Sequence, residues 1–339
     1  MKSKTIHMNR LTCLWGALLV LAAGCDREPC SLCTETETET PRHLRLDLSG
    51  SVPETKVYNV SPQTEGHVAD CRLYVFSRTG ELVDSYRSAD GLFDFYLTDE
   101  IYDFVAVANK EDLPDSRVTK AELFDRPTTL AENAVGRFVM VGRLDNHIID
   151  ADEKITLEMQ RLVGKVSYVV RTAFSGALAD AYFVVEDIYL TNVAGENKLS
   201  LADSLPATGA VWYNRLDLEP GGPSDMLYGH VGYRLGASDS LVSGHCYYPY
   251  PNASADSHDK EQWGSRCTRF VVKATLDGRT TYYPVTLSAV RANRHYHVDL
   301  TVSNYGVEHP EDRPQDYAGF RISVSVAAWE EGGSLEGNY

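Results

Sequence analysis

The sequence predicts an all-β protein built from two tandem β-sandwich domains. Apolar residues alternate with polar ones through most of the chain, and this period of two is typical of half-buried strands. The runs are short, follow one another at near-regular spacing and are separated by turn residues, while helical periodicity is almost absent. Of the 339 residues, roughly 300 follow the amino-terminal segments, a length that favours two domains over one.

The first 24 residues have the pattern of an export signal. Lys2, Lys4 and Arg10 precede an apolar run over residues 11–23. A membrane-spanning helix needs about 20 apolar residues, so this run is too short to be one. We therefore expect residues 1–24 to be removed as a signal peptide.

Cys25 is the predicted site of lipid attachment. The preceding residues, Leu-Ala-Ala-Gly, resemble the bacterial lipobox, in which the cysteine becomes the first mature residue and carries diacylglycerol on its sulfur. The pattern departs at Ala22, where leucine is usual, and the alternative is an ordinary signal peptide with a chance cysteine. Because each buried methylene contributes about 0.8 kcal/mol, two or three acyl chains would hold the protein firmly at the outer membrane.

Residues 25–42 form the predicted tether. They include alternating Thr and Glu with few apolar groups, a composition that cannot offset the entropy cost of ordering. We interpret the tether as a solvated spacer; a sorting signal for the cell surface is the alternative.

The first domain is assigned to residues 43–160. Residues 43–48 place three leucines on one face of a strand, and residues 71–76 and 81–83 flank a turn in a hairpin pattern. Further strands are predicted at 91–97, 103–108, 137–141 and 154–159, the last running on through 161–170, with weak helical character at 119–124.

The second domain is assigned to residues 161–339. Strands are predicted at 183–190, 270–276, 281–287, 295–302 and 320–328, and the region from 205 to 229 has the composition of loops. Asp277 and Gly278 form a strong hairpin turn signal between two of these strands.

Charge excludes nucleic acid as a partner. Removal of residues 1–24 leaves 29 Lys and Arg against 48 Asp and Glu, a net charge of −19 compared with −16 for the whole chain. Such a chain is repelled by nucleic acid and by anionic lipid.

The cysteines leave the disulfide pairing open. After Cys13 leaves with the signal and Cys25 is lipidated, an odd number remains, namely Cys30, Cys33, Cys71, Cys246 and Cys267. The CxxC spacing of Cys30 and Cys33 lies in the tether, without the surroundings of a redox or zinc motif. Cys246 and Cys267 flank a polar loop and are close enough in sequence for a bridge.

No residue pattern predicts catalysis, a cofactor or a metal. His295 and His297 share one face of a strand, but without a Cys or carboxylate at fixed spacing a structural pair is the better interpretation. An aromatic cluster is consistent with carbohydrate stacking, although packing explains it more simply: Tyr247, Tyr248, Tyr250 and Trp263. We therefore expect a non-enzymatic protein.

Several segments taken in order resemble the fimbrillin family, the subunits of Bacteroides-type (type V) pili. These segments are 102–109 (YDFVAVAN), 137–142 (RFVMVG), 155–165 (ITLEMQRLVGK), 248–252 (YPYPN), 282–285 (YYPV), 291–298 (RANRHYHV) and 326–329 (VAAW). Each is weak alone, but their order and spacing extend over about residues 43–339.

The resemblance implies two transthyretin-like Greek-key sandwiches and assembly by strand exchange with other fimbrial subunits. The first strand, with Leu44, Leu46 and Leu48, would occupy a groove until a protease cuts after it. The family's cut follows an Arg, yet residues 49–57 contain none, and Lys56 is the only basic residue there. An uncut chain would keep its lipid, which favours a basal anchor or accessory subunit over a repeating stalk subunit.

The last predicted strand has the apolar alternation of a donor strand, supplied by Ile322, Val324, Val326 and Ala328. It is equally consistent with the last strand of its own domain, and residues 330–339 are acidic and Gly-rich, which makes a poor groove-filler. The main interpretation is thus a lipid-anchored fimbrial subunit with no assigned adhesion target. The alternative is a surface glycan-binding lipoprotein of a nutrient-uptake system.

Overall fold

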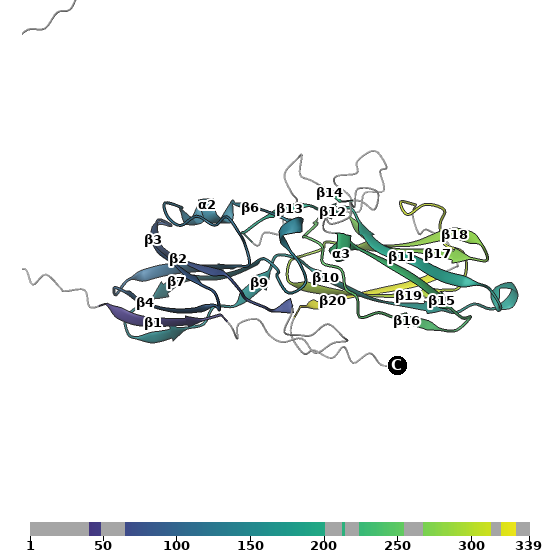
Figure 1. The fold of residues 1–339 in the computed structure, drawn as a ribbon, viewed down its shortest axis with the longest axis horizontal. Coiled ribbons are helices and arrows are strands. Elements are labelled where there is room, and N and C mark those ends of the chain that lie inside the picture. The colour runs from purple at the N-terminus through teal and green to yellow at the C-terminus, as the bar shows by residue number, and fades with distance from the viewer. Residues whose placement is uncertain are drawn as a thin grey trace, which may run out of the picture. The chain divides into compact units, whose positions relative to one another are not determined.

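A computed structural model describes residues 41–48, 65–200, 212–213, 224–253, 267–312 and 320–329. Within these ranges the protein is nearly all β, so the predicted fold class is confirmed. Figure 1 shows the strands, coloured from purple at the amino end to yellow at the carboxyl end.

Strands from the first half of the chain form two sheets. The smaller has the order β4-β1-β8 and the larger has the order β3-β2-β5-β7-β9. Their bounds are β1 Arg42–Asp47, β2 Cys71–Ser77, β3 Leu82–Ser88, β4 Leu92–Leu97, β5 Ile101–Ala108, β7 Met140–Ile148, β8 Glu153–Ile155 and β9 Met159–Arg161.

These two sheets pack face to face through aromatic and aliphatic side chains. Phe95 of β4 stacks on Tyr86 of β3 with ring centroids 4.7 Å apart and lies 6.4 Å from Phe104 of β5. Strand β5 is buried along nearly its whole length because it lies in the centre of the larger sheet. Its near-continuous apolar sequence therefore fits its position rather than the two-residue alternation of a half-exposed strand.

Strands from the second half form two further four-stranded sheets, β16-β10-β19-β20 and β15-β11-β17-β18. Their bounds are β10 Lys165–Thr172, β11 Phe183–Thr191, β15 Tyr228–Leu235, β16 Ser240–Val242, β17 Thr268–Leu276, β18 Arg279–Leu287, β19 Arg294–Val302 and β20 Phe320–Ala328.

The second pair of sheets also packs face to face. The ring centroids of Tyr168 in β10 and Phe270 in β17 lie 5.3 Å apart. Those of Tyr283 in β18 and Phe320 in β20 lie 5.5 Å apart, with the rings edge to face. The predicted hairpin between β17 and β18 is confirmed: Asp277 and Gly278 both have positive φ, as a two-residue turn of this hand requires.

Short elements complete the fold. They are α2 Lys120–Phe124, α3 Ser224–Leu227, the 3₁₀ turns Leu130–Glu132 and Gly176–Leu178, and the short strands β6 Pro127–Thr129, β12 Val193–Ala194, β13 Glu196–Lys198 and β14 Trp212–Tyr213. Thr119 caps α2 in a reciprocal capping box with Glu122, which explains why a helix of five residues forms there.

Two parts of the strand prediction are wrong. The run from 154 to 170 is not one strand, because β8, β9 and β10 belong to three different sheets. The composition of residues 205–229 predicts a loop, yet β15 begins at Tyr228. The two glycines of β15, Gly229 and Gly232, of which Gly232 has positive φ, hide the strand pattern. The described residues between 41 and 329 form one compact unit, and the division at residues 160 and 161 into two domains stays a prediction.

Candidate functional site: the first strand and its groove

Strand β1 is the middle strand of its sheet. It pairs antiparallel with β4 over six residues, from Arg42 with Leu97 to Asp47 with Leu92, and parallel with β8 from Leu44 to Leu46. Because both edges of β1 carry ladder hydrogen bonds, removal of β1 would leave two unpaired strand edges facing one another. We call the space bounded by β4 and β8 and filled by β1 the β1 groove.

The three leucines predicted as the exchangeable face lie at the bottom of the β1 groove. Leu44, Leu46 and Leu48 have exposed fractions of 0, 1 and 0%. Full burial of one such side chain contributes about 1.5–3 kcal/mol, so the three together contribute roughly 5–9 kcal/mol. The three side chains are thus buried in the groove, and their exchange stays a prediction.

A tight turn fixes the last of these leucines. The Leu48 N–H donates to the Gly91 carbonyl at 2.9 Å. Gly91 has φ +77°, and a Cβ there would lie 3.1 Å from the Leu48 Cβ. Glycine is thus required both by the backbone conformation and by the close approach of the two chains.

Acidic side chains of the groove rim hold the basic residues of β1. Arg42 donates from Nε and Nη2 to the two carboxylate oxygens of Asp99, both at 2.6 Å. This hydrogen bonding lowers the pKa of Asp99 and raises that of Arg42. Asp94 lies on the next part of the rim, with Oδ1 2.5 Å from His43 Nε2 and Oδ2 3.6 Å from Arg45 Nε.

The opposite rim of the groove supplies two more polar contacts. Asp152, just before β8, accepts a hydrogen bond from the backbone N–H of His43 at 2.9 Å. Lys154 Nζ of β8 lies 3.7 Å from Asp47 Oδ2 of β1. At the carboxyl end of β1 the strand therefore supplies the acid and the rim supplies the base.

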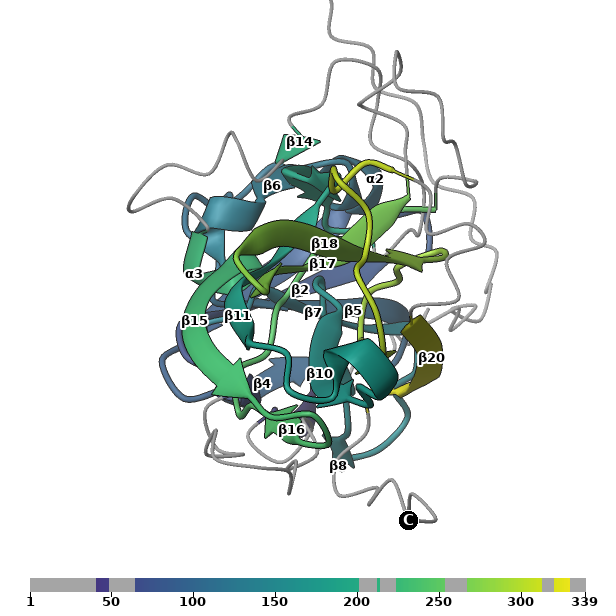
Figure 2. The same cartoon turned by 90° about the vertical axis from the view of Figure 1, so that its right-hand side faces the viewer.

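The last strand, β20, is packed much less tightly than β1. It lies at one margin of its sheet and pairs with β19 alone over nine residues (Figure 2). Its register places Ile322, Val324 and Val326 on the face of the buried Tyr296, Val298 and Leu300. Even so, Ile322 is 37% and Val326 56% exposed. The candidate residues Ile322 to Ala328 thus form the last strand of this chain's own sheet, and a donor role stays a prediction.

Trp329 pins the carboxyl end of β20. Its side chain is 2% exposed, and its backbone N–H donates to the Asn293 carbonyl at 3.1 Å. The indole stacks on Tyr248 with centroids 5.9 Å apart, and the Arg161 guanidinium lies 4.3 Å above the indole ring. Burial of this kind contributes several kcal/mol, since truncating a buried aromatic typically costs about 3–5 kcal/mol.

Next to Trp329 lies a buried ion pair that links the two halves of the chain. Lys165 Nζ is 2.8 and 2.9 Å from the Glu65 carboxylate oxygens, and the Tyr248 hydroxyl donates to Glu65 Oε1 at 2.6 Å. Burial alone would raise the pKa of Glu65, but Lys165 and these hydrogen bonds outweigh it and lower the pKa. Arg161 adds a hydrogen bond from Nε to the Glu65 carbonyl at 2.9 Å. We call Glu65, Arg161, Lys165, Tyr248 and Trp329 the junction cluster.

A second link lies around Tyr250. Its hydroxyl donates to the Thr129 carbonyl at 2.8 Å and accepts a hydrogen bond from Asn133 Nδ2 at 2.9 Å. Nearby, β6 and β13 pair antiparallel, from Pro127 with Lys198 to Thr129 with Glu196. The two groups of sheets are therefore joined by side-chain and backbone hydrogen bonds within one compact unit.

Several predicted residues lie outside the described ranges. They are the lipidation residue Cys25, the processing residue Lys56, the tether cysteines Cys30 and Cys33, and Trp263 of the aromatic cluster. The remaining cysteines, Cys71, Cys246 and Cys267, are buried, and no disulfide joins Cys246 to Cys267. Burial raises the pKa of Cys71 to about 12 and that of Cys246 to about 11, which keeps both as unreactive thiols.

The two predicted histidines form a polar pair with Ser167. His295 Nε2 and His297 Nδ1 lie 2.7 and 2.9 Å from the Ser167 hydroxyl. Burial lowers the pKa of His295 to about 4 and also lowers that of His297. Within the described ranges, no group of three or more metal-ligating side chains is close enough to hold an ion.

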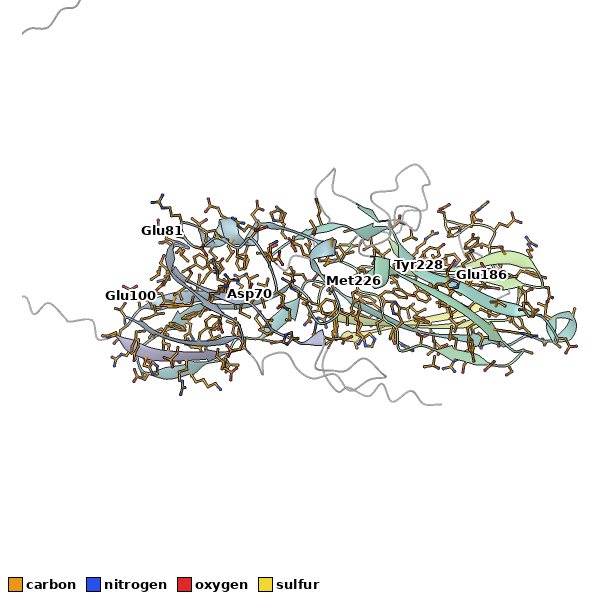
Figure 3. The ribbon with its side chains drawn as sticks, viewed as in Figure 1. Asp70, Glu81, Glu100, Glu186, Met226 and Tyr228 are labelled. Atoms are coloured by element: carbon orange, nitrogen blue, oxygen red, sulfur yellow. The ribbon has the colours of Figure 1, made fainter. Side chains whose placement is uncertain are left out.

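A charged cluster on β11, β15 and β17 escaped sequence analysis. A β-bulge between Val185 and Asp187 leaves Glu186 out of the strand pairing. Lys273 Nζ lies 2.7 Å from the Glu186 carboxylate and 3.3 Å from the Asp187 carboxylate. Tyr228, which Figure 3 labels together with Glu186, donates a hydrogen bond from its hydroxyl to Asp187 Oδ1 at 2.6 Å. The Asp187 carboxylate has hydrogen-bond partners in Tyr228, His230 and Lys273. We therefore interpret it as a group that stabilises the sheet.

The aromatic cluster is core rather than binding surface. Tyr247, Tyr248 and Tyr250 are at most 1% exposed, so none of the three has a ring face free to stack on a sugar. The expectation that packing explains these residues is confirmed, and the main support for the glycan-binding alternative is lost.

The junction cluster was the largest omission of the sequence analysis. Glu65 is separated from Lys165 by 100 residues and from Tyr248 by 183. No local spacing connects them. The only signal was indirect, since Arg161 and Lys165 interrupt an apolar run, where charged residues are rarely buried unless they are paired.

Comparison with solved structures shows that the chain shares its fold with fimbrial and cell-adhesion proteins. The fimbrilin FimA of Porphyromonas gingivalis W83 aligns with a TM-score of 0.59 at 18% identity, covering 87% of this chain and 99% of that chain. A putative cell adhesion protein of Bacteroides eggerthii gives a TM-score of 0.59 at 14% identity, with 85% and 96% covered. The tip fimbrial protein Mfa3 of P. gingivalis, truncated at its carboxyl end, gives 0.54 at 14% identity, with 86% and 100% covered.

No protein-family model matches the sequence, and no curated protein is similar to it at the level of sequence. At such low identities the solved structures establish a common fold. Among the described helices none has the length and apolar character needed to span a membrane.

Proposed function

We propose that this protein is a structural subunit of a cell-surface fimbria that assembles by strand exchange, and that it serves as an anchor or accessory subunit. The observation that carries the proposal is the seating of β1. Strand β1 fills a groove between β4 and β8, with three buried leucines and a hydrogen-bonded ladder on each edge. Such a groove can accept an equivalent strand from another subunit by β-augmentation. The likeness of the fold to fimbrial proteins supports the same conclusion.

The energetics of the groove require exchange rather than simple opening. Loss of β1 without replacement would expose three leucines, at a cost of roughly 5–9 kcal/mol, and unpair two strand edges. This is comparable to the whole stability of a typical domain. An incoming strand must therefore enter the groove as β1 leaves it, so that its own side chains fill the leucine positions and its backbone pairs with the exposed strand edges.

Two features favour an anchor or accessory subunit over a repeating stalk subunit. Residues 49–57 lack the Arg at which the family's stalk subunits are cut, so β1 would stay covalently attached to the chain and would leave the groove only in exchange for an incoming strand. At the other end, β20 could act as a donor only after Trp329 leaves the junction cluster, which opposes its release.

In this proposal the lipid on Cys25 attaches the protein to the outer membrane. The tether over residues 25–42 then spaces the body from the lipid headgroups. The partners are other fimbrial subunits and the membrane that receives the lipid. The chain acts without cofactor, metal or catalysis.

The mass of the mature surface protein tests this role. We expect the acyl groups and residues 25–56 to be retained, as in an anchor or uncut subunit. A mature protein that begins near Val57 and lacks lipid would contradict the anchor role and indicate processing like that of a stalk subunit. Absence of this protein from purified fimbriae would contradict the fimbrial role itself.

A further inference from the structure

The charges around the β1 groove indicate which kind of strand the groove accepts. This inference rests on the strand exchange proposed above and concerns the partner. Along β1 the ionisable side chains read Arg42, His43, Arg45 and then Asp47, three bases followed by an acid. The groove rim has the complementary order, with Asp99 and Asp94 facing the bases and Lys154 facing the acid.

The rim acids have no other cation among the contacts described for them. Asp99 is bound by both guanidinium nitrogens of Arg42, and Asp94 lies between His43 and Arg45. Both carboxylates are part-exposed, so solvent screens each pair and each contributes little by itself. Three such pairs in one register affect the choice of partner and the rate of association more than the total affinity.

The chain's own last strand does not match this pattern. Aligned on the apolar positions, Ile322, Val324 and Val326 of β20 replace the three leucines. Arg321 then takes the place of His43, while Ser323 and Ser325 take the places of Arg45 and Asp47. In any register and either direction, β20 supplies one cation, because Arg321 is its only charged residue.

We propose that the β1 groove selects a donor strand from a different subunit, one whose apolar residues alternate with basic side chains and end in an acidic one. The groove discriminates against β20 of an identical copy, so a donor strand from a different subunit enters it in preference to a second copy of this chain. Selection operates through Asp94 and Asp99, which a neutral strand would leave without partners.

Peptide exchange tests this inference. A specific protease site placed between Gly50 and Lys56 of the full mature chain allows β1 to be cut free, and native mass spectrometry then follows its replacement by synthetic peptides. One peptide has the sequence of residues 41–50. A second has the same sequence with Arg42, His43 and Arg45 replaced by Gln. A third has the sequence of residues 319–329, and a fourth adds Ser323→Arg and Ser325→Asp to the third.

We expect the 41–50 peptide to enter at least about fivefold faster than its neutral form, and the charged form of the 319–329 peptide to enter about fivefold faster than the native form. In 1 M salt, where the Debye length is about 3 Å, these preferences should largely disappear. The double variant Asp94→Asn/Asp99→Asn should lose them at low salt. The control Asp180→Asn removes one charge from an exposed turn far along the chain and should keep them.

The outcomes separate the two proposals. Entry of all four peptides at equal rates, or preferences unchanged in the double variant, would overturn the charge selection and leave strand exchange standing. Failure of every peptide to replace β1, the 41–50 peptide included, would overturn strand exchange and this inference with it.

Discussion

At the scale of single residues, the least expected feature is a buried ion pair between distant parts of the sequence. Glu65 and Lys165 are 2% and 5% exposed, and their opposite charges compensate one another. The Tyr248 hydroxyl adds a hydrogen bond to the Glu65 carboxylate. Removal of one partner leaves a buried charge, which typically costs about 3–5 kcal/mol.

We therefore expect Lys165→Met to lower the free energy of unfolding by about 3 kcal/mol, and the double variant Glu65→Gln/Lys165→Met to recover part of that loss. Urea denaturation of the two single variants and the double variant measures the coupling. Additive effects would show that the pair does not act as a unit.

His295 gives a pH dependence with a defined sign. Its pKa is lowered by burial from 6.5 to about 4, so between these values the unfolded chain binds a proton that the folded chain does not. Stability from this group is complete above pH 6.5 and falls as the pH drops toward 4. The expected loss at pH 5 is about 2 kcal/mol relative to pH 7.5.

The comparison of wild type with His295→Gln isolates this contribution, since the ionisable groups far from His295 titrate equally in both proteins. The variant should have a shallower loss of stability between pH 7.5 and pH 5 in urea denaturation. If the free energy of unfolding fell equally with pH in both proteins, burial of neutral His295 would not be the source of this pH dependence.

At the scale of elements, the two terminal strands are held in opposite ways. Strand β1 is held along its length by buried leucines, whereas β20 has half-exposed side chains and is held at its end by Trp329. Trp329→Ala should therefore speed amide hydrogen exchange across β20 by at least about tenfold and leave exchange in β1 unchanged.

Trp329→Phe is the matched variant. The indole N–H is buried and finds no hydrogen-bond partner within the described part of the chain, so phenylalanine keeps an aromatic ring in place and loses no side-chain hydrogen bond. It should behave close to wild type. Equal exchange in β20 for wild type and the Ala variant would mean that β19 pairing alone retains the strand.

At the scale of the whole molecule, the two groups of sheets should unfold together. The junction cluster, the Tyr250 hydrogen bonds and the β6–β13 pairing all cross from one group to the other. We expect a single calorimetric transition whose calorimetric and van't Hoff enthalpies agree. Two separate transitions would show that these links are too weak to couple the sheets.

The sequence by itself determined the class of structure and most strand positions. Alternation in residues 43–48 gave the correct face of β1, and the Asp277-Gly278 turn was visible because two-residue hairpins need positive φ. Both are local properties, governed by neighbouring residues and backbone sterics. The same local view failed at 154–170, where three short strands enter three sheets, and at β15, where glycines mask the pattern.

Only the tertiary structure decided which residues meet across long stretches of chain. The rim acids of the β1 groove come from β4, the turn after it and the segment before β8, and Glu65 finds Lys165 and Tyr248 from three separate regions. Such contacts depend on strand order and register rather than on spacing along the chain. The sequence therefore predicted that β1 presents three leucines to a groove, and the fold decided that charged neighbours on the groove rim surround them.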